Sequence, residues 1–208
     1  MRSPTYNRLA WSTTPADYVQ FAAAAIASGD GPLLEAAAGS AAATAGLHAH
    51  SRRPTVLVDL SRAMLERAAR RIAAAREDDE PEIPAHIRLV QADLLALPFP
   101  AHGFTTILSL GITHLFDDLS PLLMALGVQL APGGELHLAG LVTHTHRGRR
   151  YLEILHRGGE VARPRTAEEL HLALGSPAVF STTGCMAYAT LPAAQVGSTS
   201  TTPTAKPA

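Results

Sequence analysis

IRLVQADLLALPFPAHGFTTILSLGITHLFDDLSPLLMALGVQLAPGG, residues 87–134, is the stretch that decides the fold of this chain. An apolar strand is predicted at 87–92 and leads into Asp93, and a second strand is predicted at 106–110 after a loop with two prolines. A helix at 119–130 then closes on a Pro-Gly-Gly turn. Ligands of open α/β sheets bind at the carboxyl ends of the strands, so an acid in this position is placed to bind one.

Strands and helices alternate on both sides of this stretch. Apolar, β-branched runs predict strands, and alanine-rich or amphipathic runs predict helices. Strands are expected at 32–35, 54–60, 87–92, 106–110 and 135–142, with two closing strands at 179–182 and 185–191, and helices at 17–28, 40–50, 62–76, 119–130 and 166–174. The basic, histidine-bearing segment 143–150 is expected to be a loop. The alternation predicts an α/β fold whose mainly parallel sheet carries helices on both faces.

The composition favours one globular unit without a strongly charged partner. The chain has 208 residues, of which 47% are hydrophobic, and a formal net charge of −1. This is enough for one sizeable core, and it gives no electrostatic reason to expect a nucleic-acid partner. The single cysteine, Cys185, allows no disulfide within the chain, and no apolar run is long enough to span a bilayer. We therefore expect a cytoplasmic protein.

Small or acidic residues follow three of the predicted strands. The first strand leads into LEAAAGSA, residues 34–41, where small residues let a ligand approach the backbone and the next helix points its amides at that ligand. Asp59 ends the next strand, about 20 residues further on, where an acid accepts hydrogen bonds from ribose hydroxyls. Asp93 follows the third strand. The plainer explanations are a tight turn for 34–41, a helix cap for Asp59 and a turn-initiating role for Asp93.

The order of these segments resembles that of the class I S-adenosylmethionine-dependent methyltransferases that act on small molecules. The blocks that carry the resemblance are LLEAAAGSA (33–41), VLVDLSRAMLERAARR (56–71), IRLVQADLLALPFP (87–100), GFTTILSLGITHLFDD (103–118) and LAPGGELHLAG (130–140). Their combination is specific, although no single block is. The resemblance implies a single doubly wound, mainly parallel seven-stranded sheet, a Rossmann-like fold whose last strand is antiparallel. It also implies S-adenosyl-L-methionine as cofactor and methyl transfer to a small molecule by in-line displacement.

The resemblance further implies roles for individual residues. Glu35 and Gly39 would lie against the methionine part of the cofactor, and Ala37 would also contact the cofactor. Asp59 would hold the ribose, Leu60 and Met64 would lie beside the adenine, and Asp93 and Leu94 would bind the adenine edge. Ser109, Leu110 and Gly111 would lie below the methionine part, facing the substrate. Ala37 and Ala41 depart from the family pattern, which has glycine there, and Thr105 replaces a common aspartate. Alanine is strained at a left-handed position, so a weakly active or inactive homologue stays open.

His114 is the candidate catalytic base or substrate contact. It lies four residues beyond the predicted strand 106–110, and histidine exchanges protons near neutral pH. A histidine that merely packs at a helix start is an equally good explanation. Asp117 and Asp118 are expected to begin the next helix, where the helix dipole favours acids.

Several other side chains are expected near the acceptor. His144 and His146 form a rim, Arg147, Arg149 and Arg150 attract an acidic substrate or form a solvated loop, and Tyr6 and Trp11 form a lid or a packed arm. We expect no metal site, because neither a cysteine nor a suitably spaced acid accompanies the histidines.

We expect three regions along the chain. They are an N-terminal arm and helix at 1–31, the cofactor-binding domain at 32–193 and a low-complexity, disordered tail at 194–208. Only 147–165 leaves room for a cap, which predicts an open pocket or a homodimer whose partner completes the site. Two other functions compete: a cofactor-binding but inactive methyltransferase-like partner protein, and a nicotinamide-dependent oxidoreductase. Against the latter, the chain has no G-x-G-x-x-G at its first turn and no Tyr-x-x-x-Lys pair.

Overall fold

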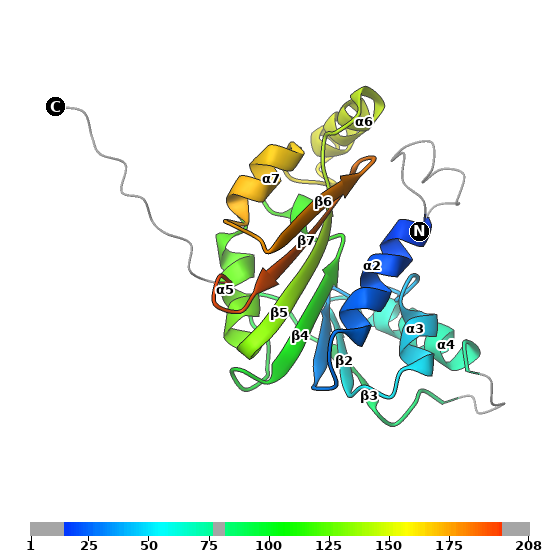
Figure 1. Cartoon of the computed structure of the whole chain (residues 1–208). Helices are drawn as coiled ribbons and strands as arrows, with labels where there is room; N and C mark the ends of the chain where they lie inside the picture. Colours follow the sequence, from blue (N-terminus) through cyan, green and yellow to red (C-terminus); the bar gives the residue numbers. More distant parts are fainter. Residues whose placement is uncertain (1–14, 77–81, 197–208) are drawn as a thin grey trace.

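A computed structural model describes residues 15–76 and 82–196, and within them seven strands form one sheet in the order β3-β2-β1-β4-β5-β7-β6 (Figure 1). The strands are β1 (Leu33–Ala36), β2 (Thr55–Asp59), β3 (Ile87–Gln91), β4 (Phe104–Leu110), β5 (Leu130–Leu141), β6 (Val179–Thr183) and β7 (Met186–Pro192). The neighbours from β3 to β5 pair in parallel, whereas β7 is antiparallel to both β5 and β6. The predicted sheet, with its antiparallel last strand, is confirmed.

Helices cover both faces of this sheet. They are α2 (Pro15–Ala27), α3 (Ala45–His50), α4 (Arg62–Ala74), the short 3₁₀ helix η1 (Thr113–Leu115), α5 (Ser120–Gln129), α6 (His146–Arg157) and α7 (Ala167–Ala173). Figure 1 shows α2, α3 and α4 on one side and α5 and α7 on the other, with α6 beyond the carboxyl end of β5.

The central strands are apolar on both faces because both faces are covered. Leu33 and Leu108 pack against Ala22 and Ala25 of α2. Their neighbours Leu34 and Ile107 point to the opposite face, as alternation along a strand requires, and join the main core. That core includes the α5 and α7 residues Leu122, Leu123, Leu126 and Leu170. Buried parallel strands therefore read as continuous apolar runs, which explains why the sequence pattern located them.

Arg53 is a buried cation that ties the two layers together. Its guanidinium donates five hydrogen bonds, to the carbonyls of Ala25, Ile26 and Gly31 and to the hydroxyls of Thr105 and Thr106, at 2.6 to 3.2 Å. The first two carbonyls belong to the last turn of α2, and both threonines lie on β4. Thr105 therefore supplies a neutral acceptor at the position where the family commonly has an aspartate.

Three elements differ from prediction. The strand predicted at 135–142 begins at Leu130, so the Pro-Gly-Gly segment 132–134, predicted as the turn that ends a helix, lies within β5. The helix predicted at 40–50 begins only at Ala45, because the turn before it contains left-handed residues. The loop predicted at 143–150 is wrong from His146 onward, where α6 begins. The Thr145 hydroxyl caps this helix by accepting from the Gly148 amide at 3.0 Å, and a Cβ on Gly148 would lie 2.1 Å from the sulfur of Cys185. Gly148 is thus needed for close packing. The helix was not predicted, because glycine and a run of charged residues are not typical of a helix.

Several predicted features lie outside the residues that the structure describes. The lid candidates Tyr6 and Trp11, residues 77–81 and the tail from residue 197 lie outside the described residues. Residues 194–196 form a turn, in which Val196 is buried against Gly127 of α5. Among the helices of the described ranges, none has the length and apolar character needed to cross a membrane.

Candidate functional site

The turn after β1 bends through three left-handed residues. Ala37, Gly39 and Ala41 have φ angles of 56°, 55° and 48°. A Cβ added to Gly39 would meet no atom within 4 Å, so the space over this residue is open. The two alanines therefore hold the backbone conformation that glycine would hold in the family pattern, at a cost of about 1–2 kcal/mol each. The turn therefore leaves its backbone at Gly39 open to a ligand.

Replacing either alanine by glycine is expected to stabilise the protein. For Ala37→Gly and Ala41→Gly we expect the free energy of unfolding to rise by about 0.5–1 kcal/mol each, because relief of left-handed strain exceeds the added chain entropy of glycine. Urea unfolding measures the change. Ala38→Gly in the same turn is the control and should destabilise, since Ala38 is not left-handed. Equal losses for Ala38→Gly and Ala37→Gly would contradict the expected strain.

Asp59 joins the end of β2 to this turn. One carboxylate oxygen accepts from the Gly39 amide at 2.7 Å and the other from the Ser61 amide at 2.8 Å. The Ser61 hydroxyl in turn accepts from the Met64 amide and caps α4. Each carboxylate oxygen keeps a second acceptor site, so Asp59 still has capacity for two donors from a ligand. The structure thus brings Gly39 and Asp59 together, and the ribose role of Asp59 stays a prediction.

Glu35 is buried and held by α3. Its carboxylate accepts from the Thr44 hydroxyl at 3.0 Å and lies 2.5 Å from Nε2 of His48. All three side chains are almost completely buried, at 2% exposure or less. Sequence reasoning missed Thr44 and His48, although their i, i+4 spacing places both on one helix face. Glu35 therefore has an internal positioning network, and its contact with the cofactor stays a prediction.

The residues expected around the adenine, all within the described part of the chain, are not joined to one another by hydrogen bonds, unlike Asp59 and Gly39. Asp93 accepts from the Leu95 amide at 2.9 Å, which is the turn-forming role considered for it. The Leu94 side chain belongs to the main core, and Met64 is half-buried. Leu60 is 69% exposed, which is unusual for leucine and fits an apolar surface that a ligand would cover.

Unpaired polar groups gather at the end of β4. Within 15–76 and 82–196, the buried Ser109 hydroxyl and Nδ1 of His114 have no hydrogen-bond partner. Gly111 has a φ of 81°, and a Cβ there would lie 3.5 Å from the hydroxyl of Tyr18 and 4.0 Å from Cε1 of His114. Buried polar atoms without partners are uncommon in folded proteins and indicate a place where a ligand supplies them. Tyr18 was not foreseen, because it comes from α2, far away in the sequence.

Burial keeps His114 uncharged. Desolvation lowers the pKa of its imidazole from 6.5 to about 4. His114 is therefore neutral at pH 7 and can accept a hydrogen bond, but it is a weak base. The imidazole lies where the sequence placed it, just beyond β4.

The lowered pKa makes stability depend on His114. Between pH 4 and 6.5 the unfolded chain binds a proton that the folded chain rejects, so the free energy of unfolding should fall as the pH falls through this window. The loss is about 3 kcal/mol at most. His114→Asn should flatten this part of the curve, measured by urea unfolding at pH 7 and pH 4.5, whereas His144→Asn, at an exposed position, should not. An unchanged slope in His114→Asn would contradict the assignment.

A strap at 161–165 fixes η1 from outside. The Ala162 amide donates to the His114 carbonyl at 2.9 Å, and the guanidinium of Arg165 donates to the carbonyls of Thr113 and Asp117. The Asp117 carboxylate accepts from the Arg163 amide at 2.9 Å. Asp117 thus secures the strap rather than beginning α5 as predicted. Asp118 does precede that helix, and its carboxylate accepts from the Ser120 amide.

The remaining candidates lie at the surface. His144, His146, Arg149 and Arg150 are exposed, as the solvated explanation requires. No group of three or more His, Cys, Asp or Glu residues in the described ranges is arranged to hold a metal ion.

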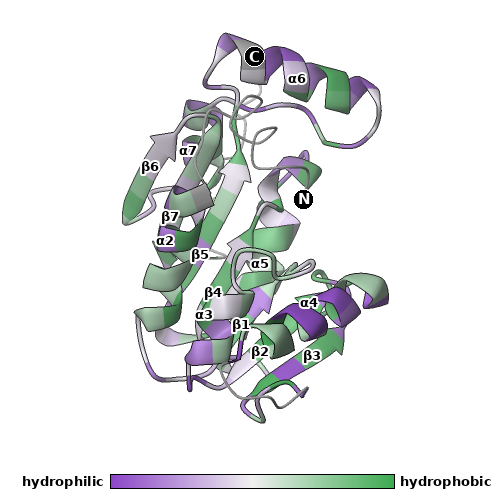
Figure 2. Cartoon of the chain, turned by 90° about the vertical axis from the view of Figure 1, so that its right-hand side faces the viewer, coloured by the Kyte–Doolittle hydropathy of each residue, from purple (hydrophilic) through white to green (hydrophobic). Residues whose placement is uncertain are grey.

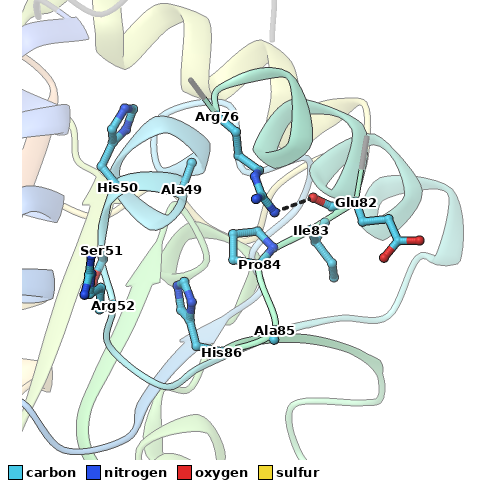
Figure 3. Close-up of a pocket in the computed structure, with 10 residues that line it drawn as sticks. All are labelled: Ala49, His50, Ser51, Arg52, Arg76, Glu82, Ile83, Pro84, Ala85 and His86. Carbon is cyan, nitrogen blue, oxygen red and sulfur yellow. Dashed lines mark hydrogen bonds between the residues drawn. The ribbon is translucent and has the colours of Figure 1, made fainter. Parts of the chain in front are cut away.

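A large open hollow of about 1030 Å³ lies elsewhere (Figure 3). Its lining comes from the end of α3 and from the segments before β2 and β3: Ala49, His50, Ser51, Arg52, Arg76, Glu82, Ile83, Pro84, Ala85 and His86. It therefore lies at the amino ends of these strands, the opposite edge from Asp59, and contains none of the predicted site residues. We assign the candidate site to the carboxyl edge on geometry rather than on cavity size.

Comparisons with known proteins concern the family and the fold. A family model described as a methyltransferase domain matches residues 33–134, which run from β1 into the first residues of β5. No curated protein matches the chain.

Solved structures share the fold at low sequence identity. The geranyl diphosphate C-methyltransferase from Streptomyces coelicolor A3(2), in complex with Mg²⁺, geranyl diphosphate and S-adenosyl-L-homocysteine, has 16% identity and a TM-score of 0.65 over 85% of this chain and 76% of that one. The CurJ carbon methyltransferase has 16% identity and a TM-score of 0.68 over 91% and 57%. A possible histamine N-methyltransferase from Thermotoga maritima has 16% identity and a TM-score of 0.63 over 89% and 92%. The resemblance noted in the sequence is confirmed.

Proposed function

We propose that the edge formed by the glycine turn, Asp59 and the end of β4 transfers methyl groups to a small-molecule acceptor. The match of residues 33–134 to a methyltransferase domain and the fold shared with solved methyltransferases support this proposal. One observation carries the location: the carboxylate of Asp59 binds the Gly39 amide in the open turn after β1, and the neighbouring parallel strand β4 ends at the same edge with unpaired polar atoms. S-adenosylmethionine supplies a methyl group on a positively charged sulfur, which a nucleophile can take by direct displacement.

The residues of the site fit this cofactor. The open space over Gly39 admits a ligand against the backbone, and the two spare acceptor positions of Asp59 suit the paired hydroxyls of a ribose. The remaining contacts that we propose are Glu35, Ala37, Leu60, Met64, Asp93, Leu94, Ser109 and Leu110. Glu35 is restrained by Thr44 and His48, so its carboxylate is already positioned before a ligand arrives.

His114 orients the acceptor in this proposal. A neutral imidazole with an unpaired Nδ1 can accept a hydrogen bond from a substrate hydroxyl or amine. The strap at 161–165 and the 3₁₀ helix η1 hold this imidazole at the end of β4 and exclude water from it. Its low pKa favours such a contact over proton abstraction from a weakly acidic group.

A ligand-stabilisation experiment tests the proposed function. Thermal unfolding of the full chain would be recorded with S-adenosylmethionine, S-adenosylhomocysteine and NAD, since a ligand of the folded state raises the melting temperature by mass action. We expect both sulfur ligands to stabilise and NAD to have no effect. No shift with either sulfur ligand overturns the proposal. Binding without turnover on a broad acceptor panel would favour the inactive homologue, for which the strained Ala37 and Ala41 are the supporting observation.

The acceptor and the assembly are also proposals. The relatives' names refer to geranyl diphosphate and histamine, which supports a small organic acceptor for this chain too. We further propose a cytoplasmic location, supported by the single buried thiol, and no nucleic-acid partner, supported by the near-neutral charge. A homodimer and the division at residues 32 and 193 remain predictions, which light scattering and limited proteolysis would check.

A further inference from the structure

Two side chains from distant parts of the chain converge on Gly111. The hydroxyl oxygen of Tyr18 and Cε1 of His114 are the two atoms nearest to the position that a Cβ on Gly111 would take, at 3.5 and 4.0 Å. Tyr18 belongs to α2, whereas His114 belongs to η1. Both groups therefore face the end of β4, where the unpaired atoms of the proposed site lie.

The position of the Tyr18 ring is set by apolar packing. The ring contacts a buried cluster formed by Ala139, Met186 and Tyr188, together with Leu110. Phe21 lies one turn further along α2 and packs on the same cluster, with its ring 5.0 Å from that of Tyr188. No hydrogen bond joins the Tyr18 hydroxyl to another residue of 15–76 or 82–196. The packing holds the ring, and the hydroxyl remains available.

The surroundings keep this hydroxyl protonated. Burial raises the pKa of Tyr18, and the nearby Glu35 carboxylate and Tyr188 phenol raise it further. Glu35 cannot easily turn toward Tyr18, because Thr44 and His48 hold both of its oxygens. The end of β4 therefore presents two uncharged groups, a phenol and an imidazole, each with a lone pair.

We propose that Tyr18 is a further residue of the methyl-transfer site, and that its hydroxyl and the His114 imidazole form a neutral pair of hydrogen-bond acceptors facing the reactive end of the cofactor. The inference rests on the proposed function and adds a residue from outside the matched domain. Lone pairs fixed in a dry site stabilise positive charge next to them, and they cost no reorganisation during the reaction. A C–H group next to a positive sulfur is a weak donor to such lone pairs.

Sinefungin tests this arrangement without an acceptor. It carries an amine in place of the sulfur-bound methyl group, so it places strong hydrogen-bond donors where the pair should accept them. Isothermal titration of the full chain with sinefungin and with S-adenosylhomocysteine would give both dissociation constants. Tyr18→Phe should weaken sinefungin binding about tenfold, as expected for one hydrogen bond to a charged group, and change S-adenosylhomocysteine binding by less than about twofold. Tyr188→Phe, in the same cluster, is the matched control and should change neither.

The outcomes separate this inference from the proposed function. If the wild-type chain binds neither ligand, the proposed function fails. If the wild type binds both and Tyr18→Phe weakens both equally, or weakens neither, Tyr18 is only a packing residue and the inference is overturned. Should Tyr18→Phe lower the melting temperature sharply, His114→Asn tests the same pair from its other side. His114→Asn should also weaken the binding of sinefungin more than that of S-adenosylhomocysteine. An unchanged ratio of the two dissociation constants would overturn the proposed pair of acceptors.

Discussion

Asp59→Ala is expected to weaken the binding of S-adenosylhomocysteine about a thousandfold, because two charge-assisted hydrogen bonds to the ribose are worth roughly 3–6 kcal/mol. The same change removes the acceptor of the Gly39 amide and loosens the turn after β1. Isothermal titration with the wild type and the variant measures the two dissociation constants. Asp59→Asn should fall between them, since an amide keeps one acceptor oxygen but loses the charge.

Two further carboxylates serve to interpret that result. Asp93→Ala should also weaken binding, but by less, because its carboxylate already accepts from the Leu95 amide in a local turn. Asp118→Ala removes an exposed carboxylate on the acceptor side and should leave cofactor affinity unchanged. If Asp59→Ala binds like the wild type, the assignment of the ribose to the end of β2 is wrong. Equal losses in all three variants would instead point to a general effect of charge.

Arg53→Ala is expected to lower the free energy of unfolding by about 4 kcal/mol, because it deletes five buried or partly buried hydrogen bonds worth roughly 0.5–1.5 kcal/mol each. The Ile26 carbonyl at the end of α2 would lose its Arg53 donor, the Ala25 carbonyl would keep only the amide and hydroxyl of Ser28, and a cavity would form beside β4. Urea unfolding at pH 7 measures the loss. A loss of this size is a large part of the total stability of an ordinary domain, so the milder variant Arg53→Lys should be measured as well.

Arg52 is the natural control for this experiment. It is the preceding residue in the chain, has the same charge, and is exposed rather than buried. Arg52→Ala should change the free energy of unfolding by less than about 0.5 kcal/mol. Arg53→Lys should recover only part of the loss, because an ammonium cannot present the planar fork that reaches α2 and β4 together. Similar midpoints for Arg52→Ala and Arg53→Ala would show that the buried network contributes little.

Residues that follow a strand directly were predictable one by one. Asp59 was expected near Gly39, and the two are joined by a hydrogen bond of 2.7 Å. This worked because parallel strands of one sheet place their carboxyl ends along one edge, so strand assignment alone brings these residues together. The same reasoning located His114 beyond β4. The prediction of a loop at 143–150 failed, because the Thr145 cap and the close packing of Gly148 on Cys185 stabilise α6 despite its polar, glycine-containing sequence.

The sequence by itself determined the succession of strands and helices along the chain, the glycine-type turn and the acids at the strand ends. Each of these features depends on local periodicity and on neighbouring residues. Only the tertiary structure decided which partners these groups receive. Glu35 is held by His48, Arg53 bridges α2 and β4, and the hydroxyl of Tyr18 and the ring of His114 both lie beside Gly111. Such contacts join residues that are far apart in the chain, and they depend on how helices pack across the sheet. A local pattern, such as the mixture of hydrophobic and hydrophilic residues along α4 in Figure 2, does not encode that packing, which is why Thr44, His48 and Tyr18 emerged only in three dimensions.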